Sequence, residues 1–181
     1  MQLGRITAVT ITSPDLDRVI EIYSKYLGYR FISSTTVSAE QAKIWDAENI
    51  EGSRMIFMSP ESSNDFFFRF IEQDIDEDYV PFGTYGWNAA ELIVKDVDQS
   101  AEKLIGSPFE VIGEPADLSF TDQIRAMQIL GPSKEIIYLT QFKSKLNEFD
   151  SPSPRCDIDQ TFIAVSYTHL RAHETREDGG W

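Results

Sequence analysis

The spacing of hydrophobic residues changes along the first part of the chain. A β-branched run at Ile6–Thr12 is typical of a strand, and from Asp15 onward the apolar residues recur at helical spacing. Gly28 follows this segment as a residue that commonly ends helices. The apolar helical positions are Leu16, Val19, Ile20, Tyr23 and Leu27. The pattern predicts a strand, a helix and a second strand.

The same succession returns in the second half of the chain. An apolar run to Val94 precedes a predicted helix from Asp96 to about Ile105, a Gly-Ser-Pro stop and a strand at Phe109–Ile112. The aspartates of "PDLD" and "KDVD" lie at an offset of 81 residues. Two similar segments at a fixed offset predict a duplicated unit.

Each unit continues with two segments typical of strands, joined by short turns that contain Pro and Ser. These segments are 54–58 and 66–72 in the first unit and 125–130 and 135–142 in the second. Residues 38–53 predict an insertion with a short helix. The fold class expected is therefore α+β with two tandem βαβββ modules, at 4–75 and 87–143, joined by a linker at 76–86.

The composition favours a soluble protein without nucleic-acid partners. Of 181 residues, 30 are acidic and 16 basic, which gives a formal net charge of −14 and repels polyanions. No apolar stretch reaches the roughly 18 residues that span a bilayer, and no basic segment precedes an apolar run at the start. We therefore expect no membrane partner and a cytoplasmic location. The single cysteine, Cys156, is expected to be a half-buried residue rather than a reactive thiol.

Three segments carry a resemblance to a known superfamily: "SPDLDRVIEIYSKYLGYRF", "KDVDQSAEKL" and "GPSKEIIYLTQF". Over residues 4–143 the chain resembles the vicinal oxygen chelate superfamily of glyoxalases, extradiol dioxygenases and bleomycin-resistance proteins. The resemblance implies that the two modules form a cupped open sheet around a small-molecule ligand. Family members often dimerise, so it also implies a homodimer as one assembly open to this chain.

The resemblance also indicates which positions would hold a divalent metal ion. In the metal enzymes of this family, inward-facing His or Glu residues on the first and last strands of each module hold one divalent ion. Those places fall on Ala8, Arg69, Ala89 and Tyr138. Alanine offers no ligand atom, arginine stays cationic, and tyrosine ionises only near a pKa of about 10. We therefore expect no metal and no other cofactor. A register slip that brought Glu72 to the Arg69 place would turn it to the opposite face.

The two-residue period of strands then predicts a ligand site among the residues that share these faces. Its predicted members are Thr10, Thr12, Phe67, Arg69, Glu91, Gln128 and Tyr138. Gln128 and Arg125 lie on a strand whose facing the sequence leaves open. Glu91 and Arg69 neutralise each other in one interpretation, with Tyr138 hydrogen-bonded to the pair. In the other, Glu91 is a catalytic base, and Arg69 and Tyr138 bind or stabilise the charge of a ligand.

The carboxy-terminal residues follow a different pattern. His169 and His173 lie four apart beside Glu174, a spacing typical of metal ligands on a helix. However, residues 165–181 resemble a translated sequencing adapter of the kind found in assembled metagenomic sequences, and we interpret 166–181 as an artefactual tail. Residues 144–165 then hold a linker, and "CDIDQTFIAV" resembles the opening strand of a further, truncated module.

Three functions are consistent with these observations. The first is metal-independent binding of a small organic molecule, similar in kind to the drug-sequestering members of the superfamily. The second is a metal-independent isomerase or lyase that acts on a carbonyl compound. The third is a metal-dependent glyoxalase or dioxygenase whose ligands come from a missing carboxy-terminal half. The substrate is not specified by the sequence.

Overall fold

The computed structural model describes residues 6–61, 66–83, 87–143 and 162–167. The chain divides into two compact units, Met1–Glu77 and Asp78–Trp181. The first unit contains β1 (Ala8–Ser13), α1 (Leu16–Leu27), β2 (Tyr29–Thr36), α2 (Ala39–Ile44), the 3-10 helix η1 (Glu48–Ile50), β3 (Arg54–Pro60) and β4 (Phe67–Glu72). The second contains β5 (Trp87–Ile93), α3 (Val97–Leu104), β6 (Glu110–Leu118), β7 (Thr121–Leu130), β8 (Ile136–Phe142) and β9 (Phe162–Tyr167).

The two sheets share one topology apart from β9, which adds a strand beside β5 in the second sheet. The first has the strand order β1-β4-β3-β2, and the second has the order β6-β7-β8-β5-β9. In each sheet the first strand of the module pairs in parallel with the last, β1 with β4 and β5 with β8, and the other neighbours are antiparallel. The prediction of an α+β fold with two βαβββ modules is confirmed.

Aspartates begin both long helices. The Asp15 carboxylate accepts a hydrogen bond from the Arg18 backbone N–H at 2.9 Å, and the Asp96 carboxylate does the same for Gln99 at 2.9 Å. Each satisfies a backbone donor that a helix start leaves without a partner. Gly28 ends α1 in the left-handed region at φ 67°, as the sequence predicts.

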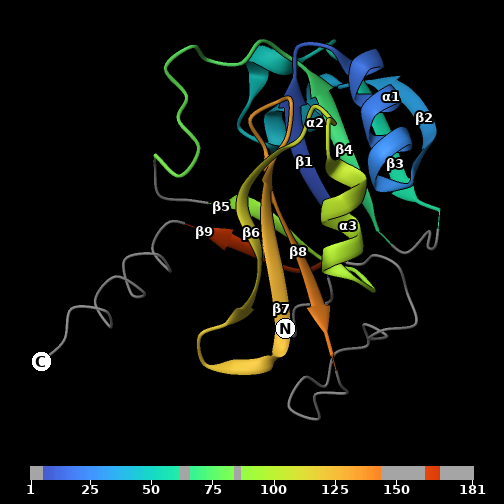
Figure 1. The fold of residues 1–181 in the computed structure, drawn as a ribbon. Helices are drawn as coiled ribbons and strands as arrows, with labels where there is room; N and C mark the ends of the chain where they lie inside the picture. The colour runs from blue at the N-terminus through green and yellow to red at the C-terminus, as the bar shows by residue number, and fades with distance from the viewer. Residues whose placement is uncertain (1–5, 62–65, 84–86, 144–161, 168–181) are drawn as a thin grey trace, which may run out of the picture. The chain divides into compact units, whose positions relative to one another are not determined.

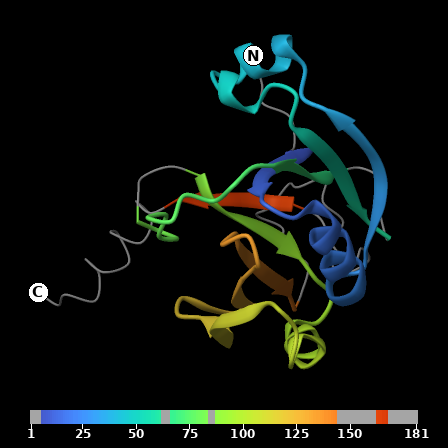
Figure 2. The same cartoon turned by 90° about the horizontal axis from the view of Figure 1, so that it is seen from above.

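A cluster of aromatic rings forms the core of the first unit. α1 lies on one face of its sheet, and α3 lies on one face of the second sheet (Figures 1 and 2). Tyr23 of α1 is fully buried and makes edge-to-face contacts with Tyr29, Phe68 and Phe70 at centroid distances of 5.8, 5.6 and 4.9 Å. Alternate residues of the phenylalanine-rich strand therefore anchor the helix to the sheet.

The predicted insertion at 38–53 forms α2 and η1. Ser38 caps α2 in a reciprocal pair of hydrogen bonds with Gln41, which is a capping box. The insertion packs a second apolar cluster against the sheet. Its buried members are Val37, Ala42, Ile50, Met55 and Ile71, with Trp45, Ala47 and Phe57 packed against them.

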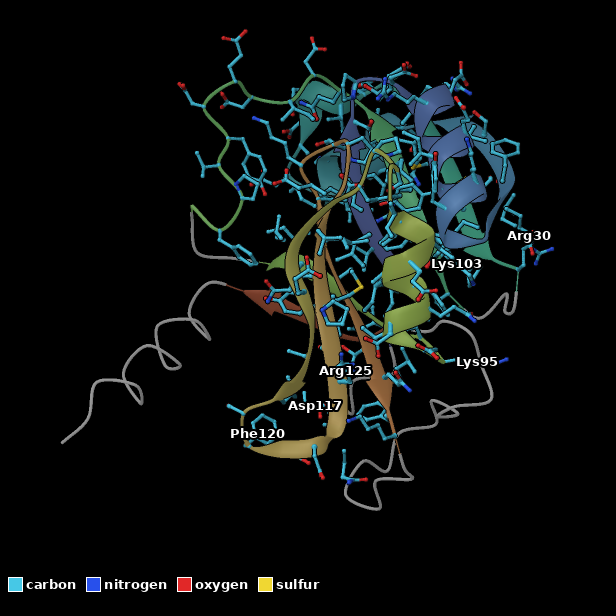
Figure 3. All side chains as sticks on the ribbon, viewed as in Figure 1. Arg30, Lys95, Lys103, Asp117, Phe120 and Arg125 are labelled. Atoms are coloured by element: carbon cyan, nitrogen blue, oxygen red, sulfur yellow. The ribbon has the colours of Figure 1, made fainter. Side chains whose placement is uncertain are left out.

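The hairpin of β6 and β7 is longer than the sequence predicts. We expected strands at Phe109–Ile112 and 125–130, whereas β6 extends to Leu118 and β7 begins at Thr121. β6 is an edge strand, so Pro115 continues it without removing a hydrogen bond from the sheet interior. The pairing of β6 with β7 is irregular at several points between Val111 and Leu118. Phe120 lies at the turn of this hairpin, beyond Asp117 and Arg125 (Figure 3).

Part of the carboxy-terminal prediction falls on the described backbone. β9 pairs antiparallel with β5, and that it opens a further module stays a prediction. Cys156, His169 and His173 lie outside the described residues, as do most of the linker and tail predicted at 144–181. Among the helices that the structure describes, none is long and apolar enough to cross a membrane.

Candidate functional site

The first group of candidate residues lies on the face of the first sheet opposite α1, the face on which the insertion packs. Since Phe68 and Phe70 contact the ring of Tyr23 on α1, their neighbours Phe67 and Arg69 point to the opposite face. Across the parallel pair, Thr10 lies beside Arg69 and Thr12 beside Ile71. The structure thus brings Thr10, Thr12, Phe67 and Arg69 onto one face, as the strand period predicts.

Arg69 is held by two contacts. Its Nε and Nη2 atoms both donate to the hydroxyl of Thr10, at 2.9 and 2.6 Å. Its guanidinium carbon lies 4.3 Å from the centroid of the Trp45 ring, a cation–π contact. Partial burial lowers the pKa of Arg69 below its usual value, but the group remains cationic at neutral pH. Among the described residues, no carboxylate forms an ion pair with it.

Aromatic side chains lie beside Arg69 on this face. Phe57 of β3 is the partner of Arg69 across the strand pair, and its ring meets that of Phe67 at 5.4 Å and 69°. Trp45 follows the last residue of α2. Sequence reasoning missed Trp45 because it lies in the insertion, outside the strand period. The only available signal was an aromatic residue at the end of a short capped helix.

The second group lies on one face of the second sheet. Tyr138 is the register partner of Glu91 on β5 and also of Gln128 on β7, so the three share a face. The Thr140 hydroxyl donates to a Glu91 carboxylate oxygen at 2.8 Å. Burial raises the pKa of Glu91 above its usual value, and the hydrogen bond from Thr140 opposes part of that increase. Glu91 has no basic partner among the residues that the structure describes.

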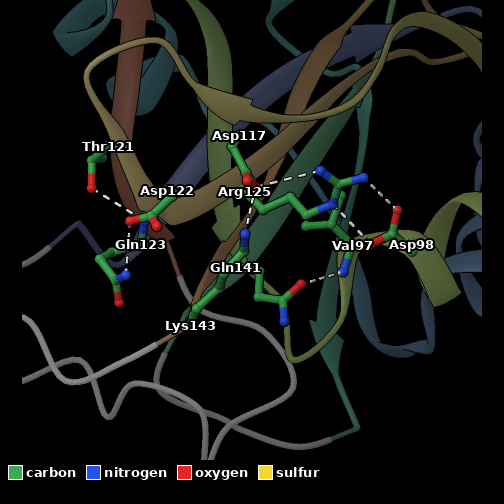
Figure 4. Close-up of polar contacts among 9 residues, drawn as sticks. All are labelled: Val97, Asp98, Asp117, Thr121, Asp122, Gln123, Arg125, Gln141 and Lys143. Carbon is green, nitrogen blue, oxygen red and sulfur yellow. Dashed lines mark hydrogen bonds and ion pairs between the residues drawn. The ribbon is translucent and has the colours of Figure 1, made fainter.

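Gln128 and Arg125 belong to opposite faces of β7. They are three positions apart, so the strand period turns Arg125 away from Tyr138. Arg125 donates two hydrogen bonds of 2.8 Å to the Asp98 carboxylate of α3 and forms an ion pair with Asp117 at 3.4 Å (Figure 4). It therefore fastens the helix to the sheet and leaves Gln128 as the β7 member of the candidate site.

Both units contain the same kind of ion pair between a strand arginine and a helix aspartate. Arg54 of β3 pairs with Asp17 of α1 at 2.8 Å, as Arg125 of β7 pairs with Asp98 of α3. Asp17 and Asp98 occupy equivalent places, one residue into each helix after the apolar residue that begins it. Both aspartates are solvent-exposed and both arginines are half-buried. The pKa of each aspartate is lowered mainly by the hydrogen bond from its arginine.

Comparison with solved structures gives an independent view of the fold. A glyoxalase family protein from Bacillus cereus superposes with a TM-score of 0.61, at 16% identity, over 80% of this chain and 97% of its own. The chain has the glyoxalase-like fold. No protein-family model matches the chain, and no curated protein matches it.

Two further structures with the glyoxalase-like fold are similar to this chain. A member of the glyoxalase/bleomycin resistance protein/dioxygenase superfamily from Sphaerobacter thermophilus gives a TM-score of 0.51 at 15% identity, over 76% of this chain and 97% of its own. Glyoxalase I from Zea mays gives 0.54 at 18% identity, over 78% of this chain and 46% of its own.

The metal that the glyoxalase-like fold implies does not fit the residues at its usual places. Ala8 and Ala89 carry no ligand atom, and Arg69 is a cation that already donates to Thr10. In the described parts of the chain, no three His, Cys, Asp or Glu side chains come together as a metal site. We therefore derive no chemistry through a metal at these positions.

The two groups of candidate residues belong to different units. Thr10, Thr12, Phe67 and Arg69 come from the first unit, and Glu91, Gln128 and Tyr138 from the second. Within its own unit each charged member has a hydroxyl partner, Thr10 for Arg69 and Thr140 for Glu91. The union of both groups in one site, and the pairing of Glu91 with Arg69, stay predictions.

Proposed function

We propose that the protein binds a small organic molecule without a divalent metal, through the residues on the candidate faces of its two sheets. The observation that carries the proposal is a charge of one sign on each face with no opposite charge near it among the described residues. These charges are the guanidinium of Arg69 and the carboxylate of Glu91, and each is partly buried.

A partly desolvated charge without an opposite charge beside it is costly unless something else compensates it. A polar ligand supplies that compensation when it binds, while apolar neighbours such as Phe57 and Phe67 contact the rest of the molecule. Small-molecule sites have this composition, with mostly apolar walls and a few polar groups that fix orientation.

The test is a ligand screen on the full chain after treatment with a chelator. A library of small carbonyl compounds, carboxylates and neutral aromatic molecules is screened by thermal shift, and hits are measured by calorimetry. Ligand at about 100 times its Kd stabilises a protein by about 2.7 kcal/mol, which such assays resolve. We expect hits whose affinity is unchanged by the chelator. Binding that appears only after zinc, iron, nickel or manganese is added would contradict the proposal.

A second candidate function, a metal-independent isomerase or lyase, is favoured by the position of Glu91. Burial raises the pKa of its carboxyl toward the range in which a carboxylate serves as a base at neutral pH. Tyr138, its register partner, and Arg69 are the groups proposed to stabilise negative charge on a carbonyl oxygen. Its substrate would be a carbonyl compound with an acidic C–H bond.

The Glu91→Gln variant distinguishes binding from catalysis. The amide oxygen still accepts the hydrogen bond from Thr140, so the local structure is preserved. Loss of turnover with ligand affinity retained supports catalysis, whereas unchanged conversion of a confirmed substrate excludes Glu91 as the base. Glu102→Gln, an exposed carboxylate on α3, is the matched control and is expected to leave both quantities unchanged.

A further inference from the structure

The geometry points to a subsite for a planar organic carboxylate, built by Arg69, Trp45 and Thr10 in the first unit. This inference rests on the proposed function and names the chemical class of its ligand. Trp45 comes from the insertion rather than from the sheet, and its ring stacks on the guanidinium of Arg69.

The first step is the count of hydrogen-bond donors on Arg69. A guanidinium has five N–H groups, and the two bonds to Thr10 use the Nε hydrogen and one on Nη2. Both hydrogens of Nη1 and the second of Nη2 have no partner among the described residues. These atoms form the fork that binds a carboxylate through two parallel hydrogen bonds. Thr10 fixes one edge of the guanidinium and leaves that fork to a ligand.

The second step is the rigidity of the guanidinium plane. The centroid of the Trp45 ring lies 4.3 Å from the guanidinium carbon of Arg69. The backbone N–H of Trp45 donates a hydrogen bond to the Gln41 carbonyl at 3.0 Å. The capping box of Ser38 and Gln41 fixes the start of the same short helix. A fork held on two sides loses less conformational entropy when a ligand binds than a free arginine does.

The third step is the contrast with Arg54 on β3 and Arg125 on β7. Arg54 donates to Asp17 at 2.8 Å and Arg125 donates to Asp98 at 2.8 Å, so both are neutralised by aspartates. Arg69 has a hydroxyl and an indole instead, neither of which carries negative charge. An anion that neutralises the guanidinium of Arg69 therefore has to come from outside the described residues of the first unit.

The fourth step is the class of anion. A single cation in a chain with a net charge of −14 suits one negative charge better than the several charges of a phosphate ester. Phe57 is the strand partner of Arg69, and Phe67 lies two residues before Arg69 on the same face; their rings are in contact at 5.4 Å. Flat apolar neighbours favour a flat apolar body on the ligand, so an aryl or conjugated monocarboxylate fits both features.

The experiment compares probes that differ in one property. The full chain is titrated calorimetrically with 2-naphthoate, with its neutral amide, and with inorganic phosphate. We expect the carboxylate to bind about tenfold to a hundredfold more tightly than the amide, the range for losing a hydrogen bond to a charged group. Phosphate is expected to bind more weakly than the carboxylate. Equal affinities for carboxylate and amide overturn the inference.

Variants locate the subsite. Arg69→Met is expected to lose the preference for the carboxylate, and Arg69→Lys keeps the charge but loses the fork, so it should retain only part of it. Trp45→Leu is expected to weaken the carboxylate more than the amide, because the stacked cation loses its support. Arg54→Met, an arginine of the same unit already paired with Asp17, is the matched control and is expected to bind both probes as the parent does.

The outcomes separate this inference from the proposed function. Metal-free binding of neutral molecules with an unchanged carboxylate preference in Arg69→Lys and Arg69→Met leaves the proposed function standing and ends the inference. Absence of metal-free binding by any molecule of the wider screen ends both. If Arg69→Met does not fold, the comparison of carboxylate and amide on the parent chain still decides the charge preference, and Arg69→Lys decides its location.

Discussion

Tyr29→Phe is expected to stabilise the protein. Tyr29, the first residue of β2, is 1% exposed, and its hydroxyl has no hydrogen-bond partner within the part of the chain that the structure describes. Burial also raises the pKa of this phenol well above its usual value. A hydroxyl in this position loses its hydrogen bonds to water on folding and gains none in return.

The magnitude follows from that loss. A buried polar group without a partner costs about 1–3 kcal/mol, and phenylalanine keeps the ring contacts of Tyr29 with Tyr23 and Phe68. The volume lost is one oxygen atom, so the cavity cost is small compared with deletion of a side chain. We expect a gain of about 1 kcal/mol or more. For a folding unit of about 60–100 residues, 1 kcal/mol shifts Tm by about 4–8 °C.

The assay is urea unfolding followed by circular dichroism, with Tm measured in parallel. Tyr26→Phe is the control, because Tyr26 lies on α1 with its side chain partly exposed, and we expect a change within about 0.5 kcal/mol. A Tyr29→Phe variant that is less stable than the parent by about 1 kcal/mol would refute the reasoning, since the hydroxyl would then have a partner such as a buried water.

Three further predictions concern stability. Burial raises the pKa of Glu91 in the folded protein. The parent should therefore lose stability as pH rises from about 4.3, the pKa of an unfolded glutamate, through the folded pKa. Glu91→Gln should remove this loss when urea unfolding is measured across the same pH range. The hydrogen bond from Arg125 lowers the pKa of Asp98. Asp98→Asn should therefore cost a little stability above about pH 4. The stabilities of the parent and of Asp98→Asn should become equal as pH falls through the folded pKa or as salt is added. Gly28→Ala should cost about 1 kcal/mol in thermal unfolding, because φ at 67° strains any residue with a Cβ while the surrounding space is open.

Each of these has an outcome that contradicts it. Equal pH dependence in Glu91→Gln and the parent would mean that another group causes the loss. A salt-independent cost of Asp98→Asn would assign it to packing instead of charge. A stabilised Gly28→Ala variant would show that the entropy removed from the unfolded chain outweighs the strain of the left-handed conformation.

The sequence by itself determined the elements and much of the facing of the strands. The helix from Leu16 to Leu27 was predicted from its apolar period, from Asp15 before it and from Gly28 after it. The 81-residue offset predicted that α3 and its strands would repeat the first unit. These features are local or periodic, so a single stretch of residues contains the information that specifies them. The family resemblance, combined with the strand period, predicted that Thr10 shares a face with Arg69 and Glu91 with Tyr138. Both parallel pairs have the register that this requires, without a bulge.

Only the tertiary structure decided which side chains meet across elements. Trp45 stacks on Arg69, two residues from separate elements of the first unit that no periodicity connects. The facing of Gln128 depends on the register of β7 against β8, and a shift of one residue would have placed Arg125 on the Tyr138 face instead. The sequence records which residues alternate along one strand, whereas contacts between strands and helices depend on how separate segments pair and pack, and that pairing sets the chemistry of the site.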